Sequence, residues 1–278
     1  MVYPDMGLSM ALRSATPASA PVESSKGDRD DPLFVQSVEK AFRVLKAFSA
    51  KRPTLSLSQI ASISGLDKSA AQRFTHTLER LGHLYKDPYT KHFELTSRTL
   101  AAANNYTQSN PLVRRAIPYL LQLATTTEEA TNLSVLEDTD VVFVARFISR
   151  NAIAPHVTVG GRSPAFCTAP GVAILSQMPE TAARAILTAS NLRAYTPRTT
   201  WRLPDLLVRI RDAAERGYAV CSEEILINDV SVAAPVLDRD GKPVAAVNVA
   251  VSKLRYTAAA AETRFAPIVI ETAQAISA

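Results

Sequence analysis

The chain has 278 residues, 47% of them hydrophobic and 21% charged, so it is long enough for two domains that each bury a core. No apolar run reaches the roughly eighteen residues of a membrane helix, which excludes an integral membrane protein and predicts a soluble cytoplasmic one. The formal net charge is +5, and residues 32 to 95 carry ten Lys and Arg against five Asp and Glu, which predicts an anionic partner such as nucleic acid for this segment.

The first 31 residues are rich in Ser, Ala, Pro and Asp without periodicity, and they predict a disordered tail. Pro4 and Pro17 interrupt any apolar segment there, which argues against a secretory signal. The two cysteines, Cys167 and Cys221, allow at most one disulfide, and reduced, buried thiols are the ordinary expectation for a cytoplasmic protein.

A winged helix-turn-helix is predicted for residues 32 to 96. Its first helix is expected after Ser37, a good N-cap, and apolar residues at helical spacing predict one buried stripe: Val38, Ala41, Phe42, Leu45 and Phe48. Ser58 is expected to cap a second, short helix. That helix should end at Gly65, because a helix commonly ends in a left-handed glycine.

After a turn at Leu66 and Asp67, residues 68 to 81 predict a third helix that is followed by Gly82. The predicted inward stripe is Ala70, Phe74, Leu78 and Leu81. The opposite face carries five polar residues: Ser69, Gln72, Arg73, His76 and Arg80. Such a face is ordinarily a solvated surface, but the preceding helix and turn are expected to present this one to a groove of DNA.

A basic hairpin is predicted next, because Leu84 and Leu95 mark strand ends on either side of the loop sequence KDPYTKH. In a dimer that reads a roughly palindromic double-stranded operator, we expect Gln72, Arg73 and His76 to lie nearest the base edges. The expected phosphate contacts are Lys68, Ser69, Lys86 and Lys91.

The rest of the chain predicts an α+β sensing domain at residues 111 to 278. A linker helix at 97 to 110 is expected to join it to the winged helix-turn-helix domain, which we call the reader domain. Strands are predicted at 132–136, 141–147, 155–159, 230–237 and 244–251. Helices are predicted at 112–125, 171–178, 181–187, 203–216 and 258–278. Helices around an antiparallel sheet are typical of ligand-binding sensor domains.

Over residues 34 to 276 the chain resembles the IclR family of bacterial transcriptional regulators. Five segments carry the resemblance: FVQSVEKAFRVLKAF (34–48), LSQIASISGLDKSAAQRFTHTLERLGHL (57–84), VGGRSPAFCTAPGVAIL (159–175), RGYAV (216–220) and SVAAPVLDRDGKPVAAVNVAVS (231–252). The resemblance implies a GAF-like effector domain, dimers that pair into tetramers, and operator binding that a small carboxylate modulates.

Three shorter segments look most like regulators of aromatic-acid catabolism that respond to protocatechuate, 4-hydroxybenzoate or β-ketoadipate: AAQRF (70–74), LTSRTLAAANNYTQSNPL (95–112) and PAFCT (164–168). An aromatic carboxylate is therefore the expected effector. A non-aromatic carboxylate, such as a keto or dicarboxylic acid, stays open as the alternative.

Carried over by position, the effector site implied by the resemblance is Phe166, Cys167, Thr168, Ala169, Gly171, Cys221 and Ser231. The residue types agree with this, because Thr168 can cap a helix with Pro170 in its first turn, and free N–H groups at a helix start favour a carboxylate.

The chain also departs from the family's pattern. Many members carry an acidic residue where Cys221 stands, and a Gly-hydrophobic-Arg triplet in place of residues 228 to 230, which are Asn, Asp and Val here. Loss of that arginine would remove a fixed cation beside the site. Arg146, Arg162 or His156 are the candidates to replace it, although an exposed surface position is the ordinary expectation for each.

Enzymatic function is not indicated. The chain contains no G-x-S-x-G, H-E-x-x-H, P-loop or G-x-G-x-x-G motif, and its four histidines and two cysteines have no spacing suited to zinc. No cofactor, metal or membrane partner is expected. A DNA-binding architectural protein without an effector is a second alternative, but it would not need the large C-terminal domain.

Overall fold

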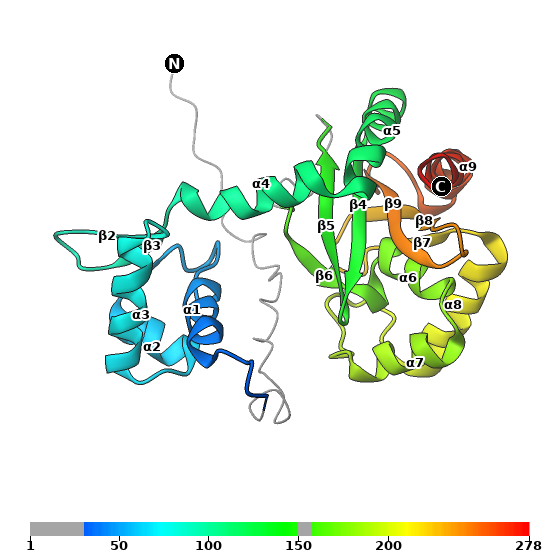
Figure 1. Cartoon of the computed structure of the whole chain (residues 1–278). Helices are drawn as coiled ribbons and strands as arrows, with labels where there is room; N and C mark the ends of the chain where they lie inside the picture. The colour runs from blue at the N-terminus through cyan, green and yellow to red at the C-terminus, as the bar shows by residue number, and fades with distance from the viewer. Residues whose placement is uncertain (1–30, 150–156, 278) are drawn as a thin grey trace, which may run out of the picture. The chain divides into compact units, whose positions relative to one another are not determined.

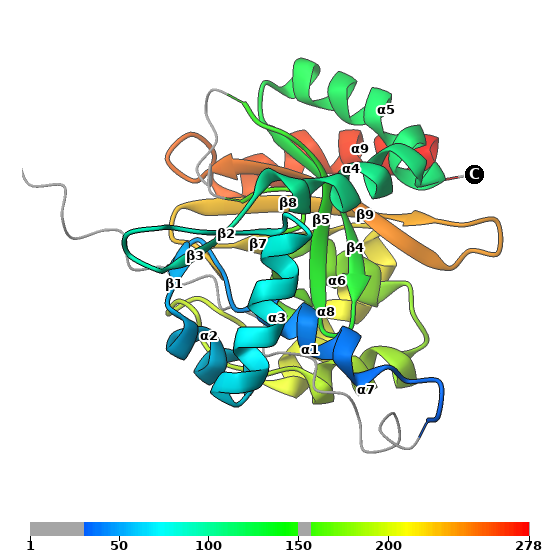
Figure 2. The ribbon, with the colours of Figure 1, turned by 60° about the vertical axis from the view of Figure 1, so that its left-hand side comes forward.

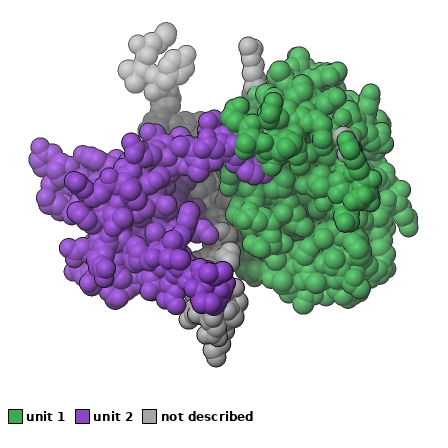
Figure 3. Space-filling model, in the orientation of Figure 1, with its two compact units in different colours: residues 1–16, 107–278 green, residues 17–106 purple. Residues whose placement is uncertain are grey.

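The computed structural model describes residues 31–149 and 157–277, and the chain forms two compact units that divide between Tyr106 and Thr107 (Figure 3). Nearly all of the predicted N-terminal tail, residues 1–31, lies outside the described residues. Within those ranges, no helix is both long and apolar enough to cross a membrane.

The smaller unit is a winged helix-turn-helix, as predicted (Figure 1). Its helices are α1 (Gln36–Lys46), α2 (Leu57–Ser64) and α3 (Lys68–Arg80). Its strands β1 (Thr54–Leu55), β2 (Leu84–Lys86) and β3 (Phe93–Leu95) form an antiparallel sheet in the order β1-β3-β2, of which β1 was not predicted. The core beneath them consists of Val44, Ala47, Phe48, Leu55, Ile60, Leu78, Leu84 and Phe93.

The predicted buried stripe of α1 is wrong in its first half. Val38 and Phe42 are 52% and 58% exposed, whereas Val44 and Phe48 are buried. The helix also begins two residues earlier than a Ser37 cap implies, with Val35 at its N-cap. The cause is that α1 carries two apolar stripes, and helical spacing alone does not say which of them the core covers.

The ends of α2 and α3 follow from local chemistry. Gly65 ends α2 in the left-handed region at φ 63°, as predicted, and the Asp67 carboxylate caps α3 by accepting from the Ala70 N–H at 2.8 Å. The cap of α2 is Ser56 rather than Ser58. Ser56 and Gln59 form a reciprocal capping box, in which the Ser56 N–H donates to the Gln59 side chain at 2.8 Å.

The buried side of α3 is shifted from the predicted stripe. Ala71, Thr75 and Leu78 are buried, Ala70 and Phe74 are half-buried, and Leu81 is 54% exposed. Of the four predicted inward residues, only Leu78 is fully covered. The buried side of the helix is therefore shifted by about one residue from the sequence pattern. Thr75 tolerates the core because its hydroxyl donates to the Gln72 carbonyl of its own helix.

The larger unit is an α+β domain around a six-stranded antiparallel sheet with the order β6-β5-β4-β9-β8-β7 (Figure 1). The strands are β4 (Ala130–Glu137), β5 (Asp140–Phe147), β6 (Arg162–Pro164), β7 (Ala219–Ser222), β8 (Asp229–Leu237) and β9 (Pro243–Ser252). The strand predicted at 155–159 is wrong for its described residues, 157–159, and the rest of it is not described. β6 and β7 were not predicted.

Helices cover both faces of this sheet, as Figures 1 and 2 show. The 3-10 turn η2 (Ser97–Thr99) and α4 (Leu100–Ser109) occupy the predicted linker segment, and α5 (Pro111–Thr127) packs with α9 (Ala258–Ile276) on one face. The other face is covered by η3 (Ala165–Cys167), α6 (Ala169–Ser176), α7 (Glu180–Ala189) and α8 (Leu203–Arg216). The predicted helix at 203–216 is confirmed at both ends, and those at 112–125, 171–178, 181–187 and 258–278 are confirmed to within two residues at each end.

Alternation along the central strands separates two cores. Val230, Val232, Val247 and Val249 belong to the core beneath α5 and α9. Their neighbours Ala233 and Ala246 belong to the core beneath α6. Successive side chains of a strand point to opposite faces, so the residues next to the valines face α6.

The capping box supplies a test of the fold. We expect Ser56→Ala to lower the free energy of unfolding by about 1 kcal/mol, because it removes the side chain that accepts from the Gln59 N–H. Ser58→Ala is the matched control, since Ser58 is exposed and caps no helix. Urea unfolding of the two variants measures the difference. Equal losses, or a larger loss for Ser58→Ala, would contradict the assignment of the cap.

Candidate functional site

The outward face of α3 is the first candidate site. Ser69, Gln72, Arg73, His76 and Arg80 are all exposed, as predicted. The Asp67 cap and the left-handed turn at Gly65 fix where this helix begins after α2. The arrangement gives an exposed helix face with two guanidinium groups, an amide and an imidazole, which are groups suited to phosphate oxygens and base edges.

The hairpin between β2 and β3 holds its shape through its own polar groups. The Asp87 carboxylate accepts from the N–H groups of Tyr89 and Thr90 at 2.9 and 2.6 Å, and these bonds hold its pKa below the usual range. Lys91 has a left-handed backbone at φ 59°, and its ammonium donates to the Pro88 carbonyl at 2.7 Å. Lys86 lies 5.3 Å from the centre of the Phe93 ring. Lys86 and Lys91, two of the four predicted phosphate contacts, are thus exposed at the hairpin with local contacts of their own.

The second candidate site is a row of four polar side chains on the α6 face of the large sheet, which we call the polar row: Arg146, Asn132, Asn248 and Ser231. Arg146 Nη1 donates to Asn132 Oδ1 at 2.9 Å, Asn132 Nδ2 to Asn248 Oδ1 at 3.2 Å, and Asn248 Nδ2 to Ser231 Oγ at 2.9 Å. The row therefore crosses the four neighbouring strands β5, β4, β9 and β8.

Strand register produces the polar row. Asn132 is directly opposite Arg146 on β5 and opposite Asn248 on β9, while Ser231 is opposite Cys221 on β7 and Ala250 on β9. The amides of Asn132 and Asn248 and the hydroxyl of Ser231 belong to residues that are 1%, 3% and 7% exposed. Buried polar groups of this kind cost stability unless they are hydrogen-bonded, which explains why they bond to one another.

The segment from Phe166 to Gly171 lies beneath the same face. Phe166, Cys167 and Ala169 are buried, and a Cβ on Gly171 would lie only 2.2 Å from the Ala165 carbonyl oxygen. Gly171 is thus required by the close approach of α6 to η3. Thr168 is the N-cap residue of α6, but the predicted side-chain cap is wrong: its hydroxyl donates to the Pro164 carbonyl at 3.0 Å.

The two cysteines are buried, free thiols on this side of the sheet. Burial raises the pKa of both, Cys221 raises that of Cys167 further, and Arg209 works in the opposite direction on each. Both therefore remain protonated at neutral pH, and neither is a nucleophile. Cys221 presents a small, weakly polar side chain beside Ser231.

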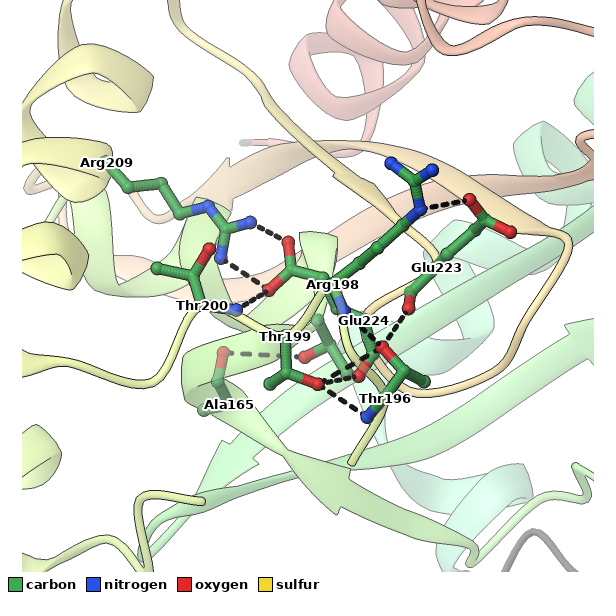
Figure 4. A network of polar contacts seen from close by, with 9 residues as sticks. Ala165, Thr196, Arg198, Thr199, Thr200, Arg209, Glu223 and Glu224 are labelled. Atoms are coloured by element: carbon green, nitrogen blue, oxygen red, sulfur yellow. Dashed lines mark hydrogen bonds and ion pairs between the residues drawn. The ribbon is translucent and has the colours of Figure 1, made fainter. Parts of the chain in front are cut away.

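A network of polar contacts joins the loops next to β7 (Figure 4). Glu224 is buried, and its carboxylate accepts from Arg209 of α8 at 3.0 Å and from the Thr200 N–H at 3.1 Å. The Thr199 hydroxyl donates to the Glu224 carbonyl at 2.7 Å, and the Thr196 hydroxyl donates to the Glu223 carbonyl at 2.5 Å. These bonds hold the 196–200 loop and α8 against the strand end that follows Cys221.

Residues 228 to 230 do not lie as the resemblance to the family implied, with the third of them beside the effector site. Val230 is fully buried in the core beneath α5 and α9, so a side chain at this position faces away from the polar row. The expectation that loss of an arginine here removes a cation beside the site is therefore wrong. Asn228 is a left-handed turn residue at φ 66° whose N–H donates to Glu223 Oε1 at 3.1 Å.

Asp229 lies on the α6 face two residues before Ser231 and interacts electrostatically with Arg146. Burial raises the pKa of its carboxyl to about 7, although the charge of Arg146 acts to lower it. Of the three proposed replacement cations, Arg146 alone is in the polar row. Arg162 instead bonds to Glu137 and Asp140 at 2.7 and 3.1 Å, and His156 is outside the described residues.

The structure thus brings together two residues expected at the effector site, Cys221 and Ser231, and adds two that sequence reasoning missed, Asn132 and Asn248. A signal for the missed pair exists, since each is the one amide side chain of its strand, ATNLSVLE or PVAAVNVAVS, and has apolar residues on both sides or on one. Such an amide is expected to have a buried partner. Among the described residues, no group of three or more His, Cys, Asp or Glu is arranged to hold a metal ion.

Comparison with known proteins identifies both units. Residues 37–88 match the IclR helix-turn-helix domain, and residues 104–278 match the bacterial transcriptional regulator IclR C-terminal domain. The chain is 32% identical to the Pca regulon regulatory protein of Pseudomonas putida over 266 residues, which are 92% of this chain and 91% of that one. It is 28% identical to the p-hydroxybenzoate hydroxylase transcriptional activator of Acinetobacter baylyi over 77% and 80% of the two chains.

Solved structures show the same fold. The IclR transcriptional regulator from Alicyclobacillus acidocaldarius has a TM-score of 0.77 at 25% identity, covering 87% of this chain and 97% of that one. An IclR homologue from Microbacterium hydrocarbonoxydans, crystallised with 4-hydroxybenzoate, has a TM-score of 0.73 at 24% identity over 86% and 97%.

The raised pKa of Asp229 supplies a test of the site's electrostatics. A carboxyl whose folded pKa lies near 7 is ionised in the unfolded chain from about pH 4 upward, so folding takes up a proton in between. Its contribution to the free energy of unfolding should therefore fall as the pH rises from about 4 to about 7 and then stay constant. Asp229→Asn should remove this fall.

Urea unfolding at about pH 5 and about pH 8 measures both proteins. We expect the free energy of unfolding of Asp229→Asn, relative to that of the unaltered protein, to be higher at about pH 8 than at about pH 5. Asp238→Asn is the control, because Asp238 lies in an exposed turn where its carboxylate accepts from the N–H groups of Asp240 and Lys242. An unchanged pH dependence in Asp229→Asn would contradict the raised pKa of this carboxyl.

Proposed function

This chain belongs to the IclR family of bacterial transcriptional regulators, and we propose that it controls a catabolic operon in the cytoplasm by binding an aromatic carboxylate. The family accounts for a ligand-responsive DNA-binding regulator. The observation that supports the effector class is the polar row, which places a hydroxyl, two amides and a guanidinium on one face of the sensor sheet. The names of two relatives, which concern the Pca regulon and p-hydroxybenzoate hydroxylase, support an aromatic catabolic operon.

In the winged helix-turn-helix domain, α3 is proposed to enter the major groove of the operator, and the hairpin to contact the DNA backbone. Gln72, Arg73 and His76 would lie nearest the base edges, since they share the exposed face of α3 with no part in the core. Lys68, Ser69, Lys86 and Lys91 would hold phosphates: the first two stand in the first turn of α3, and the second two stand at the hairpin.

A second copy of the chain is proposed as the partner that completes the reader. Leu33, Val35, Val38 and Phe42 are 85%, 58%, 52% and 58% exposed, and they form an apolar surface at and before α1. A surface of this kind is costly in water and suits a contact between copies. A two-fold dimer would place two α3 helices on two half-sites of a roughly palindromic operator. Pairing of dimers into a tetramer is part of the same proposal.

For the sensor, the proposal is that a carboxylate binds between the 166–171 segment and Ser231, with Cys221 beside it. The half-buried guanidinium of Arg146 supplies a positive charge on the same face. Arg146 keeps its charge even though burial lowers its pKa, because an arginine starts so far above neutral pH. Effector binding would bias the dimer geometry and hence the half-site spacing, with a coupling free energy of about 1 to 3 kcal/mol.

Operator binding tests the reader. We expect Arg73→Ala to cost about 1 to 3 kcal/mol of operator affinity and to relax sequence preference, because a base-edge contact is lost. Lys91→Ala should weaken binding to all sequences alike and reduce its salt dependence, because a phosphate contact carries no sequence information. Arg184→Ala, in the exposed face of α7, is the charge-matched control. Gel shifts in which Arg73→Ala binds all operators as the unaltered protein does would contradict the assignment.

Thermal shift with a panel of small acids tests the sensor. The panel comprises 4-hydroxybenzoate, protocatechuate, benzoate, a keto acid and a dicarboxylic acid, and we expect an aromatic carboxylate to give the largest rise in Tm. Ser231→Ala should reduce that rise, whereas Ser222→Ala, on the opposite face of the sheet, should not. A keto or dicarboxylic acid as the best hit would favour a non-aromatic effector. No stabilisation by any acid would contradict an effector site of this kind.

A further inference from the structure

The polar row has a direction that its chemistry imposes. A guanidinium can only donate hydrogen bonds, so Asn132 must turn its amide oxygen, and not its nitrogen, toward Arg146. The Asn132 NH₂ group is then left facing Asn248, which must present its own oxygen. By the same step the Asn248 NH₂ group faces Ser231 and donates to Oγ. A donor-only group on β5 thus orients each member of the row as far as β8.

Ser231 stands at the end of this row with its hydroxyl hydrogen unused. Its oxygen already accepts from Asn248, and among the residues that the structure describes its hydroxyl donates to none. The residue is 7% exposed, so bulk water offers little compensation for that hydrogen. Ala250, its direct neighbour on β9, is part-exposed, which shows that this end of the α6 face is not fully covered.

We propose that Arg146, Asn132 and Asn248 are positioning residues that set Ser231 as a hydrogen-bond donor, so that the site selects a ligand group by its capacity to accept. This inference rests on the effector site proposed above. It goes further in that residues without a ligand contact decide whether the ligand group at Ser231 must accept or donate a hydrogen bond. A carboxylate, which only accepts, satisfies the hydroxyl hydrogen, whereas a group that only donates leaves that buried hydrogen without an acceptor.

The selection would be strong because the groups are buried. A buried donor without an acceptor loses its bonds to water without replacement, and this lowers affinity by about 10- to 100-fold. A structural role for the row, in which the amides only tie neighbouring strands together, makes a different prediction. Reversing the direction of the row would then change stability but not the preference for one ligand over another.

The row can be reversed by single substitutions. In Asn132→Asp, the new carboxylate only accepts, so Asn248 must turn its NH₂ group toward it and its oxygen toward Ser231. The Ser231 hydroxyl would then donate to Asn248, and Ser231 Oγ would be left to accept from a ligand. Asn248→Asp gives the same result by accepting directly from Ser231. The new charge has a partner in Arg146 in the first variant, and it receives two hydrogen bonds in the second.

The probes are chosen so that the charge of the introduced aspartate affects both alike and cancels in the ratio of their dissociation constants. 4-Hydroxyacetophenone and 4-hydroxybenzamide are both neutral and nearly equal in shape, and each carries a carbonyl oxygen, but only the amide can turn an N–H toward Ser231. Isothermal titration of the full-length chain gives their two dissociation constants, with 4-hydroxybenzoate measured beside them. Urea unfolding confirms that each variant is folded.

In the unaltered protein we expect the two neutral probes to bind within about tenfold of each other, because both offer an acceptor. In Asn132→Asp and Asn248→Asp the amide should be favoured over the ketone by a further 10- to 100-fold or so. Arg146→Lys keeps a donor-only cation and should retain the original ratio. Ser231→Ala removes the hydroxyl and should abolish the difference between the variants.

An unchanged ratio in a folded Asn132→Asp or Asn248→Asp protein, with binding still dependent on Ser231, would overturn this inference and leave the effector site intact. An equal shift of the amide-to-ketone ratio in Arg146→Lys would also overturn it, because that variant keeps the direction of the hydrogen bonds in the polar row. If 4-hydroxybenzoate binds but Ser231→Ala is without effect, the effector site is misplaced. If none of the three compounds binds, the aromatic effector is wrong. In either case the inference falls with the proposed function.

Discussion

The alternation of side chains across the central strands of the sensor sheet is the constraint on which most of this structure depends. β8 and β9 send valines toward α5 and α9, and the residues between them toward α6. Because successive side chains point to opposite faces, the same strands contribute to a large apolar core on one face and to a face with small and polar groups on the other. A slip of one residue would exchange the two faces.

The small side chains on the α6 face let that helix lie close to the sheet. All eight residues of α6 are buried, and Gly171 approaches the backbone of η3 so closely that no larger residue fits. The loops around β7 are then held by the ion pair between part-buried Arg209 and buried Glu224 (Figure 4). One-sided loss of such a pair is costly, because it leaves an uncompensated buried charge. The polar row thus lies in surroundings that several independent contacts keep rigid.

The reader unit depends on local chemistry to a greater degree. Its turn is made by a left-handed glycine and by a carboxylate cap, both of which act within a few residues. Its hairpin is shaped by Asp87 and its near neighbours. These bonds need no distant partner, and they leave the polar face of α3 and the basic loop exposed. Short-range bonding therefore shapes the surface that we propose to meet DNA, while long-range pairing shapes the site that we propose for the effector.

By itself, the sequence determined what local bonds and composition control. It indicated the α+β sensor, the winged helix-turn-helix, the end of α2 at Gly65, the polar face of α3 and most helices of the sensor, because caps, glycines and helical spacing act over a few residues. Only the tertiary structure decided which stripe of α1 is buried, that Val230 faces the other core, and that Arg146 belongs to the polar row. Asn132 and Asn248 bond across 116 positions of the chain, and their contact follows from strand register, which no local pattern specifies.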